Sequence, residues 1–355
     1  MTRRLDSLQA LRGVACLAVL LYHLGNIDAG FGLGFRLLGW AERVGFAGVD
    51  LFFVLSGCVL TLAARRQFGR PARLPGYLLR RGWRVFPPYW AALGVAAAVG
   101  ASTATGTPAE WFATLALLPQ EQPPALLPVA WSLTYELMFY LGLGLLLLAP
   151  PRLAGPVLVG WAGAVLAAAA VGPPAGWRRL PFDPFVLEFL AGCLVAWWPL
   201  SLGRRAGWWG TVGAVAWLAG GVAVTWHAAP DWLPTHHWPR VLVVGPPAAA
   251  AVFLAVGREH GGGRPWPRWL TVVGDASYAI YLTHTSVLVT VLYYTLLVRW
   301  PHNRAGHLAF LVVSAAAAVG FGLLFHRFVE RPLLALASRL GRSQPQSGQR
   351  PAAGA

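Results

Sequence analysis

The chain has 355 residues, of which 57% are hydrophobic and only 12% are charged. This composition excludes an ordinary soluble domain, because such a domain needs far more charge to cover its surface. The net charge is +15 and all 28 basic residues are arginines. Arginines that flank membrane helices explain this charge better than nucleic acid binding does. The sequence therefore predicts an all-α integral membrane protein without a nucleic acid partner.

Apolar segments long enough to cross a bilayer follow one another along the whole chain. We expect about ten transmembrane helices packed in one bundle. They are placed at residues 8–25, 46–64, 85–103, 128–149, 154–171, 184–200, 207–226, 240–256, 270–298 and 307–326. The apolar segment 109–119 is too short to span, so we predict an interfacial or re-entrant piece there.

The arginines also predict how the bundle is oriented. With the N-terminus inside, 20 of them fall in inner segments and seven in outer loops. Cytoplasmic loops carry the excess of basic residues, so both termini are predicted to be cytoplasmic. The membrane domain is expected to cover residues 1–338. The polar tail 339–355 has no apolar periodicity and is predicted to be disordered.

The first span carries two ionisable residues, Arg12 and His23. They lie 11 residues apart, so a helix places them on one face with a rise of roughly 16 Å between them. Ionisable groups inside a bilayer are costly and usually face a cavity or a partner. Arg12 alone could snorkel to lipid headgroups, but the aligned pair favours a functional site.

The second span contains the motif GVDLFFVLSG, with Asp50 near the membrane edge and Ser56 and Gly57 further along. Small residues such as Ser56 and Gly57 allow another helix to approach closely. Asp50 can simply pair with an arginine of a neighbouring loop. Both features therefore have structural explanations as well as functional ones.

Arg81 and Arg84 lie in the charged stretch before the third span and share one helical face. Two guanidinium groups on one face suit phosphate oxygens, because each can donate bidentate hydrogen bonds. Topology and anionic lipid explain the arginines of residues 65–73 fully. They explain the Arg81 and Arg84 pair less well.

The fourth span opens with WSLTYELMFYL, which begins at Trp131. Ser132, Glu136 and Tyr140 recur every four residues and are predicted to form one polar stripe. We expect Glu136 to have an Arg or His partner, because an unpaired carboxylate at this depth is costly. Beside a histidine, it would orient the ring and raise its basicity.

The ninth span contains SYAIYLTH, in which Ser277, Tyr281 and His284 share a face with Gly274. Tyr278 lies beside that face. Tyrosines are common at membrane interfaces and need no functional explanation. A second histidine inside the membrane is harder to attribute to packing alone.

Several titratable residues have simpler explanations. Glu330 lies two residues before Pro332, as expected at the end of a helix. The histidine-containing outer loop HAAPDWLPTHHW lacks zinc-type spacing, and the three cysteines lie in apolar stretches. We therefore predict no metal, and we expect this loop at most to contact an acceptor.

Together these stretches resemble the acyltransferase-3 family of bacterial membrane O-acyltransferases. The matching pieces are the Arg-x10-His of the first span, GVDLFFVLSG, RGWR, WSLTYE, SYAIYLTH and the terminal ERP, in the family's order over residues 5 to 335. The resemblance implies a ten-helix enzyme of the bacterial cytoplasmic membrane. It would transfer an acyl group, usually acetyl, from cytoplasmic acyl-CoA to a hydroxyl of a glycan, glycolipid or glycosylated metabolite.

The resemblance also implies roles for the polar residues. The donor-binding residues would be Arg12, Arg81, Arg84 and Ser132, and the catalytic ones His23, Glu136, Ser277, Tyr281 and His284. Supporting residues would be Asp50, Ser56, Trp131, Tyr278 and Glu330. His23 would act as general base, with Glu136 orienting it and the ninth span binding substrate or stabilising the oxyanion. An acyl-His or acyl-Ser intermediate is the alternative route.

A transporter or flippase is the competing interpretation, because buried Arg, Glu and His residues can line a substrate path. The sequence shows no internal repeat, which argues mildly against it. The outer-loop tryptophans Trp111, Trp177, Trp232 and Trp238 suit stacking on sugars, and they equally suit anchoring at the interface. Acceptor and oligomeric state are left open.

Overall fold

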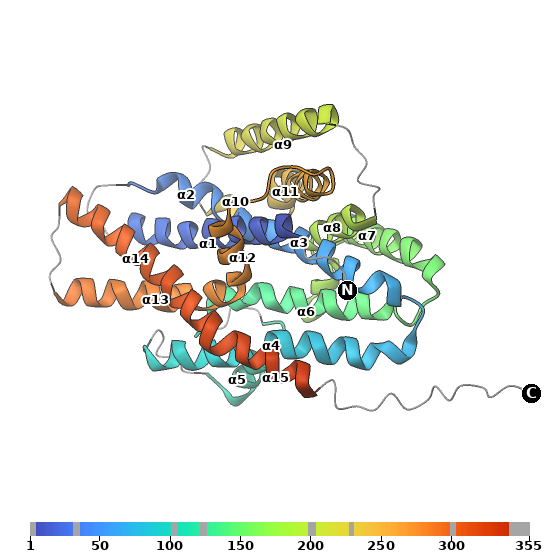
Figure 1. Ribbon diagram of the computed structural model, residues 1–355, viewed down its shortest axis with the longest axis horizontal. Coiled ribbons are helices and arrows are strands. Elements are labelled where there is room, and N and C mark those ends of the chain that lie inside the picture. The colour runs from blue at the N-terminus through green and yellow to red at the C-terminus, as the bar shows by residue number, and fades with distance from the viewer. Residues whose placement is uncertain are drawn as a thin grey trace, which may run out of the picture.

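The computed structural model describes residues 5–30, 36–100, 106–120, 126–197, 204–226, 231–298 and 303–340. Throughout these ranges the fold is helical and contains no strand (Figure 1). The long helices are α1 (Asp6–Gly30), α3 (Ala47–Ala64), α4 (Leu74–Ala98), α6 (Trp131–Leu145), α7 (Ala154–Val171), α8 (Phe185–Trp197), α9 (Arg204–Thr225), α11 (His237–His260), α13 (Ser277–Leu297) and α14 (Arg304–Phe325). The shorter ones are α2 (Gly39–Val44), α5 (Pro108–Leu115), α10 (Trp232–Thr235), α12 (Arg268–Asp275) and α15 (Arg331–Leu340).

Each predicted span contains a helix in its described part. Seven helical segments are long and apolar enough to cross a membrane: those of α1, α3, α7, α8, α11, α13 and α14. The helices α4, α6 and α9 fall outside these limits. The chain is therefore an all-helical, multi-pass membrane protein. Large apolar side chains face outwards, such as Val159 and Val313, where lipid would contact them.

Three predicted boundaries are wrong. The span 270–298 is broken at Ala276 into α12 and α13, so Gly274 does not belong to the helix that carries His284. Helix α4 begins at Leu74 and includes the arginines that we assigned to a charged loop. Helix α15 runs to Leu340, two residues into the predicted tail, and residues 341–355 lie outside the described ranges.

A π-helical turn, His326–Glu330, joins α14 to α15. Pro332 explains it, because proline has no N–H to donate to the carbonyl of Phe328, four residues earlier. The turn widens instead of continuing with regular helical hydrogen bonds. Widening changes the direction in which Glu330 points relative to the residues of α14.

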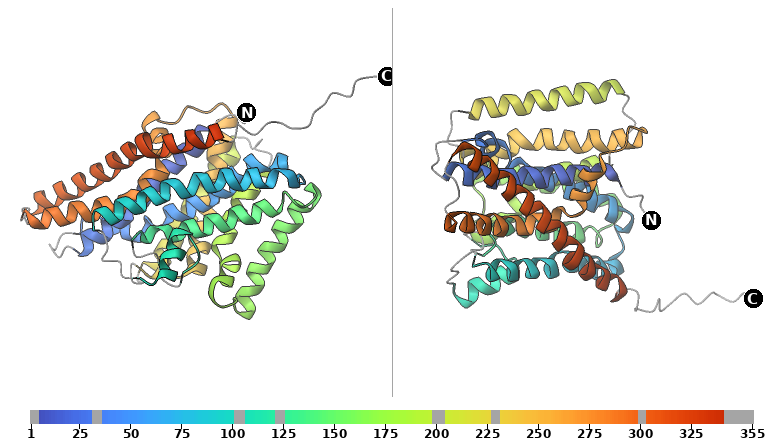
Figure 2. Two further views of the ribbon diagram at one scale, coloured as in Figure 1. Left: turned by 90° about the horizontal axis from the view of Figure 1, so that it is seen from below. Right: turned by 60° about the vertical axis from the view of Figure 1, so that its left-hand side comes forward.

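Helix ends gather at an arginine-rich end of the bundle, which we define as the end where α1 begins (Figure 1). The Glu259 carboxylate at the end of α11 accepts hydrogen bonds from the first N–H groups of α1, at Asp6 and Ser7. Arg65 after α3 donates to the Ala196 carbonyl at the end of α8. Helix α2 lies toward the opposite end (Figure 1), and α9 packs along α11 at the edge (Figure 2).

Glycines bring the helices of the core unusually close together. A Cβ atom added to Gly57 of α3 would lie 2.0 Å from the Phe189 carbonyl oxygen, and one added to Gly192 of α8 would lie 2.0 Å from that of Val54. The expected close approach at Gly57 is therefore confirmed. Gly274 packs in the same way against the Gln9 carbonyl of α1.

Candidate active site

A polar cavity of about 60 Å³ lies inside the bundle, and we call it the arginine cavity. Helices α1, α3, α4, α6 and α13 form its walls. Its polar lining consists of Arg12, Ser56, Arg84, Ser132, Glu136, Tyr140, Ser277, Tyr278 and Tyr281. The predicted stripe of Ser132, Glu136 and Tyr140 thus faces one cavity. Four distant segments of the sequence meet the first span there.

Two guanidinium groups and two carboxylates interact in and around this cavity. Arg12 donates from Nε to the Ser277 hydroxyl at 3.1 Å. Glu136 and Glu330 both interact electrostatically with Arg12 and Arg84. The Tyr140 hydroxyl donates a hydrogen bond to Glu136. Glu136 therefore has the arginine neighbours that its depth demands, and its carboxylate lies with them rather than with His23.

Arg81 lies beside the arginine cavity without lining it. Its guanidinium group packs over the rings of Tyr77 and Tyr140, at 5.7 and 5.6 Å from their centroids. Glu330 is buried and accepts a hydrogen bond from Nδ1 of His326 at 2.7 Å. Tyr278 donates to the Val85 carbonyl at 2.9 Å, which ties α13 to α4.

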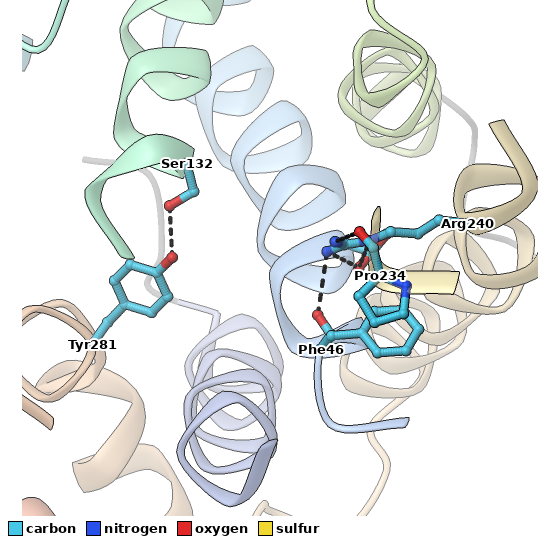
Figure 3. Close-up of polar contacts among 6 residues, drawn as sticks. Phe46, Ser132, Pro234, Arg240 and Tyr281 are labelled. Carbon is cyan, nitrogen blue, oxygen red and sulfur yellow. Dashed lines mark hydrogen bonds and ion pairs between the residues drawn. The ribbon is translucent and has the colours of Figure 1, made fainter. Parts of the chain in front are cut away.

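A group of hydroxyls closes one side of the arginine cavity. The Tyr281 hydroxyl donates to the Val129 carbonyl at 2.9 Å, and the Ser132 and Tyr281 oxygens lie 2.7 Å apart (Figure 3). The Ser132 hydroxyl also lies 3.2 Å from the Val129 carbonyl oxygen, so the two hydroxyls share this acceptor and either of them can donate to the other. These two side chains and the Val129 carbonyl form a partition, which we call the hydroxyl wall.

Beyond this wall lie the two predicted histidines. The rings of Tyr281 and His284 are 5.9 Å apart, and those of His284 and His23 are 5.1 Å apart. His284 is 1% exposed, and its Nδ1 lies 2.8 Å from the Tyr281 carbonyl oxygen. Because a carbonyl only accepts, Nδ1 carries the proton and Nε2 of the neutral ring is an acceptor. That Nε2 has no hydrogen-bond partner among the described residues.

His23 lines a second cavity of about 350 Å³, which we call the histidine cavity. Its other polar residues are Asn26, Thr285 and Ser286, and its apolar ones are Ile27, Leu126, Pro128, Leu288 and Val289. Arg12 and His23 therefore open into different cavities, although one helix carries both. His284 and the hydroxyl wall lie between the two.

Asp50 forms a buried ion pair outside both cavities. Arg240 of α11 donates to both of its carboxylate oxygens, over distances of 2.7 to 3.1 Å, and also to the Pro234 and Phe46 carbonyls (Figure 3). Asp50 is 0% and Arg240 is 3% exposed. The Trp131 ring lies 5.9 Å from the Arg240 guanidinium. Asp50, Arg240 and Trp131 thus pack together in a cluster that is separate from both cavities.

Sequence reasoning missed three polar partners. Arg240 was counted among the seven outer-loop arginines, although its position at the start of the apolar run 240–256 allows it to turn inwards. Asp28 at the end of α1 pairs with His307 of α14, with both side chains buried. His326 pairs with Glu330. No spacing in the sequence indicates the pair of Asp28 and His307. His326 and Glu330 are four residues apart, a spacing that allows their side chains to meet on a helix.

Two cavities lined by both polar and apolar side chains flank a histidine pair inside the bundle, which makes this region the candidate active site. Among the described residues no cluster of three or more His, Cys, Asp or Glu side chains could hold a metal. The acyltransferase-3 family, an acyltransferase domain, matches residues 5–327, and the chain belongs to this family. It is therefore an O-acyltransferase, which decides against the transporter or flippase interpretation.

One curated relative is the exopolysaccharide production protein ExoZ of Rhizobium meliloti (strain 1021). It is 27% identical over 318 residues, which cover 85% of this chain and 92% of the relative. No solved structure matches the chain.

Proposed function

We propose that this protein transfers an acyl group, acetyl in the simplest case, from acyl-CoA to a hydroxyl group of a polysaccharide. The observation that carries the proposal is the order of its polar groups. Two arginines line one cavity, a histidine lines another, and His284 lies between them. The name of the relative, an exopolysaccharide production protein, supports a polysaccharide as acceptor.

The donor would bind through the arginine cavity. Arg84 and Arg12 would hold its phosphates, since guanidinium groups make strong bidentate hydrogen bonds to phosphate oxygens. Arg81, stacked on Tyr77 and Tyr140, would add positive charge at the entrance. A cavity of about 60 Å³ holds roughly two water molecules, so the pantetheine arm needs the walls to move apart before it can enter.

The acceptor hydroxyl would reach His23 through the histidine cavity. His23 would take its proton while the oxygen attacks the thioester carbonyl carbon, after which the carbon–sulfur bond breaks and CoA leaves as the thiol. Nε2 of His284 is an acceptor, so His284 suits orienting His23 or sharing the proton better than donating to an oxyanion. Ser132 and Tyr281 are hydroxyl donors beside His284 that could take the oxyanion role.

The arginine-rich end would face the cytoplasm, where acyl-CoA is made, in a bacterial cytoplasmic membrane. Both termini would then be cytoplasmic, and the histidine cavity would open toward the other side. The high arginine content of the loops at this end supports that orientation.

The test is release of CoA thiol from acetyl-CoA by the purified protein. We expect wild-type protein to release thiol and His23→Ala to lose at least 10²-fold in turnover, in line with removal of a general base, while CoA binding is kept. Wild-type turnover in His23→Ala would contradict the role of the base. Absence of any thiol release by the wild type, with every acceptor tried, would contradict acyl-CoA as donor.

A further inference from the structure

A third cavity, the largest of the three at about 770 Å³, lies at the end of the bundle opposite the arginine-rich end, and we call it the outer cavity. It forms between the loop before α8, the start of α11 and the segment after α5. Its lining consists of Pro119, Gln120, Tyr135, Gly176, Trp177, Arg179, Leu180, Asp183, Thr235, His236, His237, Trp238 and Pro239. The acyl-transfer scheme above uses none of these residues.

A carboxylate and a histidine form a dyad in this cavity. Asp183 is 2% exposed, and its Oδ2 lies 2.8 Å from Nδ1 of His237. Its Oδ1 accepts the Phe185 N–H at 3.2 Å and so caps the beginning of α8. The carboxylate holds the His237 proton on Nδ1, because it only accepts hydrogen bonds. When the ring is neutral, its Nε2 is an acceptor, and this side chain is 32% exposed.

The rest of the lining combines flat aromatic faces with planar polar groups. Trp177 is 68% exposed and Trp238 also lines the cavity, while Gln120 and Arg179 add hydrogen-bonding groups. An aromatic face packs on the C–H face of a pyranose ring, and planar polar groups exchange hydrogen bonds with its vicinal hydroxyls. The cavity is far larger than a few ordered waters need.

Neighbouring stretches of the chain line the outer cavity and the histidine cavity. Pro119 and Gln120 line it on one side, and Leu126 and Pro128, a few residues later, line the histidine cavity. Helix α6 likewise carries Tyr135 in the outer cavity and Ser132 in the hydroxyl wall. A chain of linked sugars could therefore occupy the outer cavity with one unit while it presents another to His23.

We propose that the outer cavity is a carbohydrate-binding subsite that holds a sugar unit of the acceptor next to the one that is acylated. Trp177 stacks on the sugar ring, and Nε2 of His237, oriented by Asp183, accepts a hydrogen bond from a sugar hydroxyl. The inference rests on the proposed function in one respect, that the bound sugar belongs to the acceptor.

The test uses the full chain in lipid nanodiscs and saturation-transfer NMR with four probes: the hexaoses of maltose, cellulose, β-galactan and N-acetylglucosamine type. We expect wild-type protein to bind at least one. Trp177→Ala should weaken binding at least fivefold. Trp269→Ala is the matched control, because Trp269 is 61% exposed and lies on α12, away from the cavity.

Two substitutions of His237 separate its two nitrogens. Asn keeps a donor near the Nδ1 position and loses the Nε2 acceptor, whereas Gln places an acceptor near the Nε2 position. We expect His237→Asn to lose at least fivefold in sugar affinity and His237→Gln to retain most of it. Equal thermal unfolding temperatures of the variants would show that the fold is intact.

Absence of saturation transfer to all four hexaoses, or unchanged binding by both Trp177→Ala and His237→Asn, would overturn the proposal. Thiol release from acetyl-CoA is measured in parallel, with and without each hexaose as acceptor. Wild-type protein that releases thiol but binds no sugar would overturn the subsite alone. Protein that binds sugar through Trp177 and His237 but never releases thiol would overturn the proposed donor and support the subsite.

Discussion

Arg84 and Arg81 are three residues apart, yet their surroundings differ. Arg84 lines the arginine cavity, while Arg81 packs over two tyrosine rings outside it. A hydrogen bond to a charged group contributes about 1.5–3 kcal/mol. We therefore expect Arg84→Ala to raise the KM for acetyl-CoA by at least tenfold, and Arg81→Ala to raise it by about threefold or less.

Steady-state kinetics with varied acetyl-CoA checks this difference. Arg80→Ala is the matched control, because Arg80 is exposed on the same helix. Equal effects of the Arg81 and Arg84 substitutions would show that the donor reaches both guanidinium groups in the same way.

The ion pair of Asp50 and Arg240 makes a second prediction. Removal of one partner leaves a buried, uncompensated charge, which costs about 3–5 kcal/mol. Arg240→Ala should therefore lower the free energy of unfolding by that amount, and Asp50→Asn in the same chain should restore part of it. Arg43→Ala, at a half-buried arginine over Trp226, should cost under about 1 kcal/mol. Thermal unfolding in detergent compares these three variants with the wild type. An unchanged melting temperature in Arg240→Ala would contradict the prediction.

Residue periodicity predicted part of the site and could not predict the rest. Ser132, Glu136 and Tyr140 follow the helical repeat, so the sequence of this one segment predicts that they share a face. The partner of Glu136 could not be predicted in this way, because it depends on how α1, α4 and α6 are rotated relative to one another. The sequence therefore left Arg and His open as partners of Glu136, and the family resemblance implied that it orients His23. The structure brings Arg12 and Arg84 to the carboxylate.

Close contact between α3 and α8 depends on two glycines. A methyl group at Gly57 would meet the Phe189 carbonyl at 2.0 Å, where no ordinary contact can form. Gly57→Ala should therefore destabilise the protein by about 1–3 kcal/mol or more, as expected for overpacking.

Gly94 of α4 supplies the control, because a Cβ there meets nothing within 4 Å. Gly94→Ala should be neutral or slightly stabilising, since alanine favours helix more than glycine does. Both variants are compared by thermal unfolding. Equal stability of the two alanine variants would show that α3 and α8 can move apart without loss.

The number of helical segments was easier to predict than their ends. Hydropathy reports where an apolar run lies, so each predicted span contains a helix in its described part, and seven helical segments are long and apolar enough to cross a membrane. It does not report a break such as Ala276, because both sides of it are apolar. Nor does it report that α4 extends into a charged stretch, where Arg84 faces a cavity rather than water.

The orientation of the whole molecule can be tested with two engineered cysteines. The native Cys16, Cys58 and Cys193 are buried, so they give little background. Arg70 follows α3 at the arginine-rich end, and Pro174 lies in the loop between α7 and α8; both are exposed. In intact cells a membrane-impermeant maleimide should label Pro174→Cys, and it should label Arg70→Cys only after the cells are permeabilised. The reverse pattern would place the arginine-rich end outside.

The hydroxyl wall has a consequence for the energetics of the cell. An enzyme that draws on reagents from both sides of an energised membrane risks short-circuiting the proton-motive force. Here Ser132, Tyr281 and the Val129 carbonyl bond to one another between the arginine cavity and the histidine cavity. In the proposed orientation, an acyl group would pass across this partition while the two cavities stay separated, so acyl transfer would not open a path for ions.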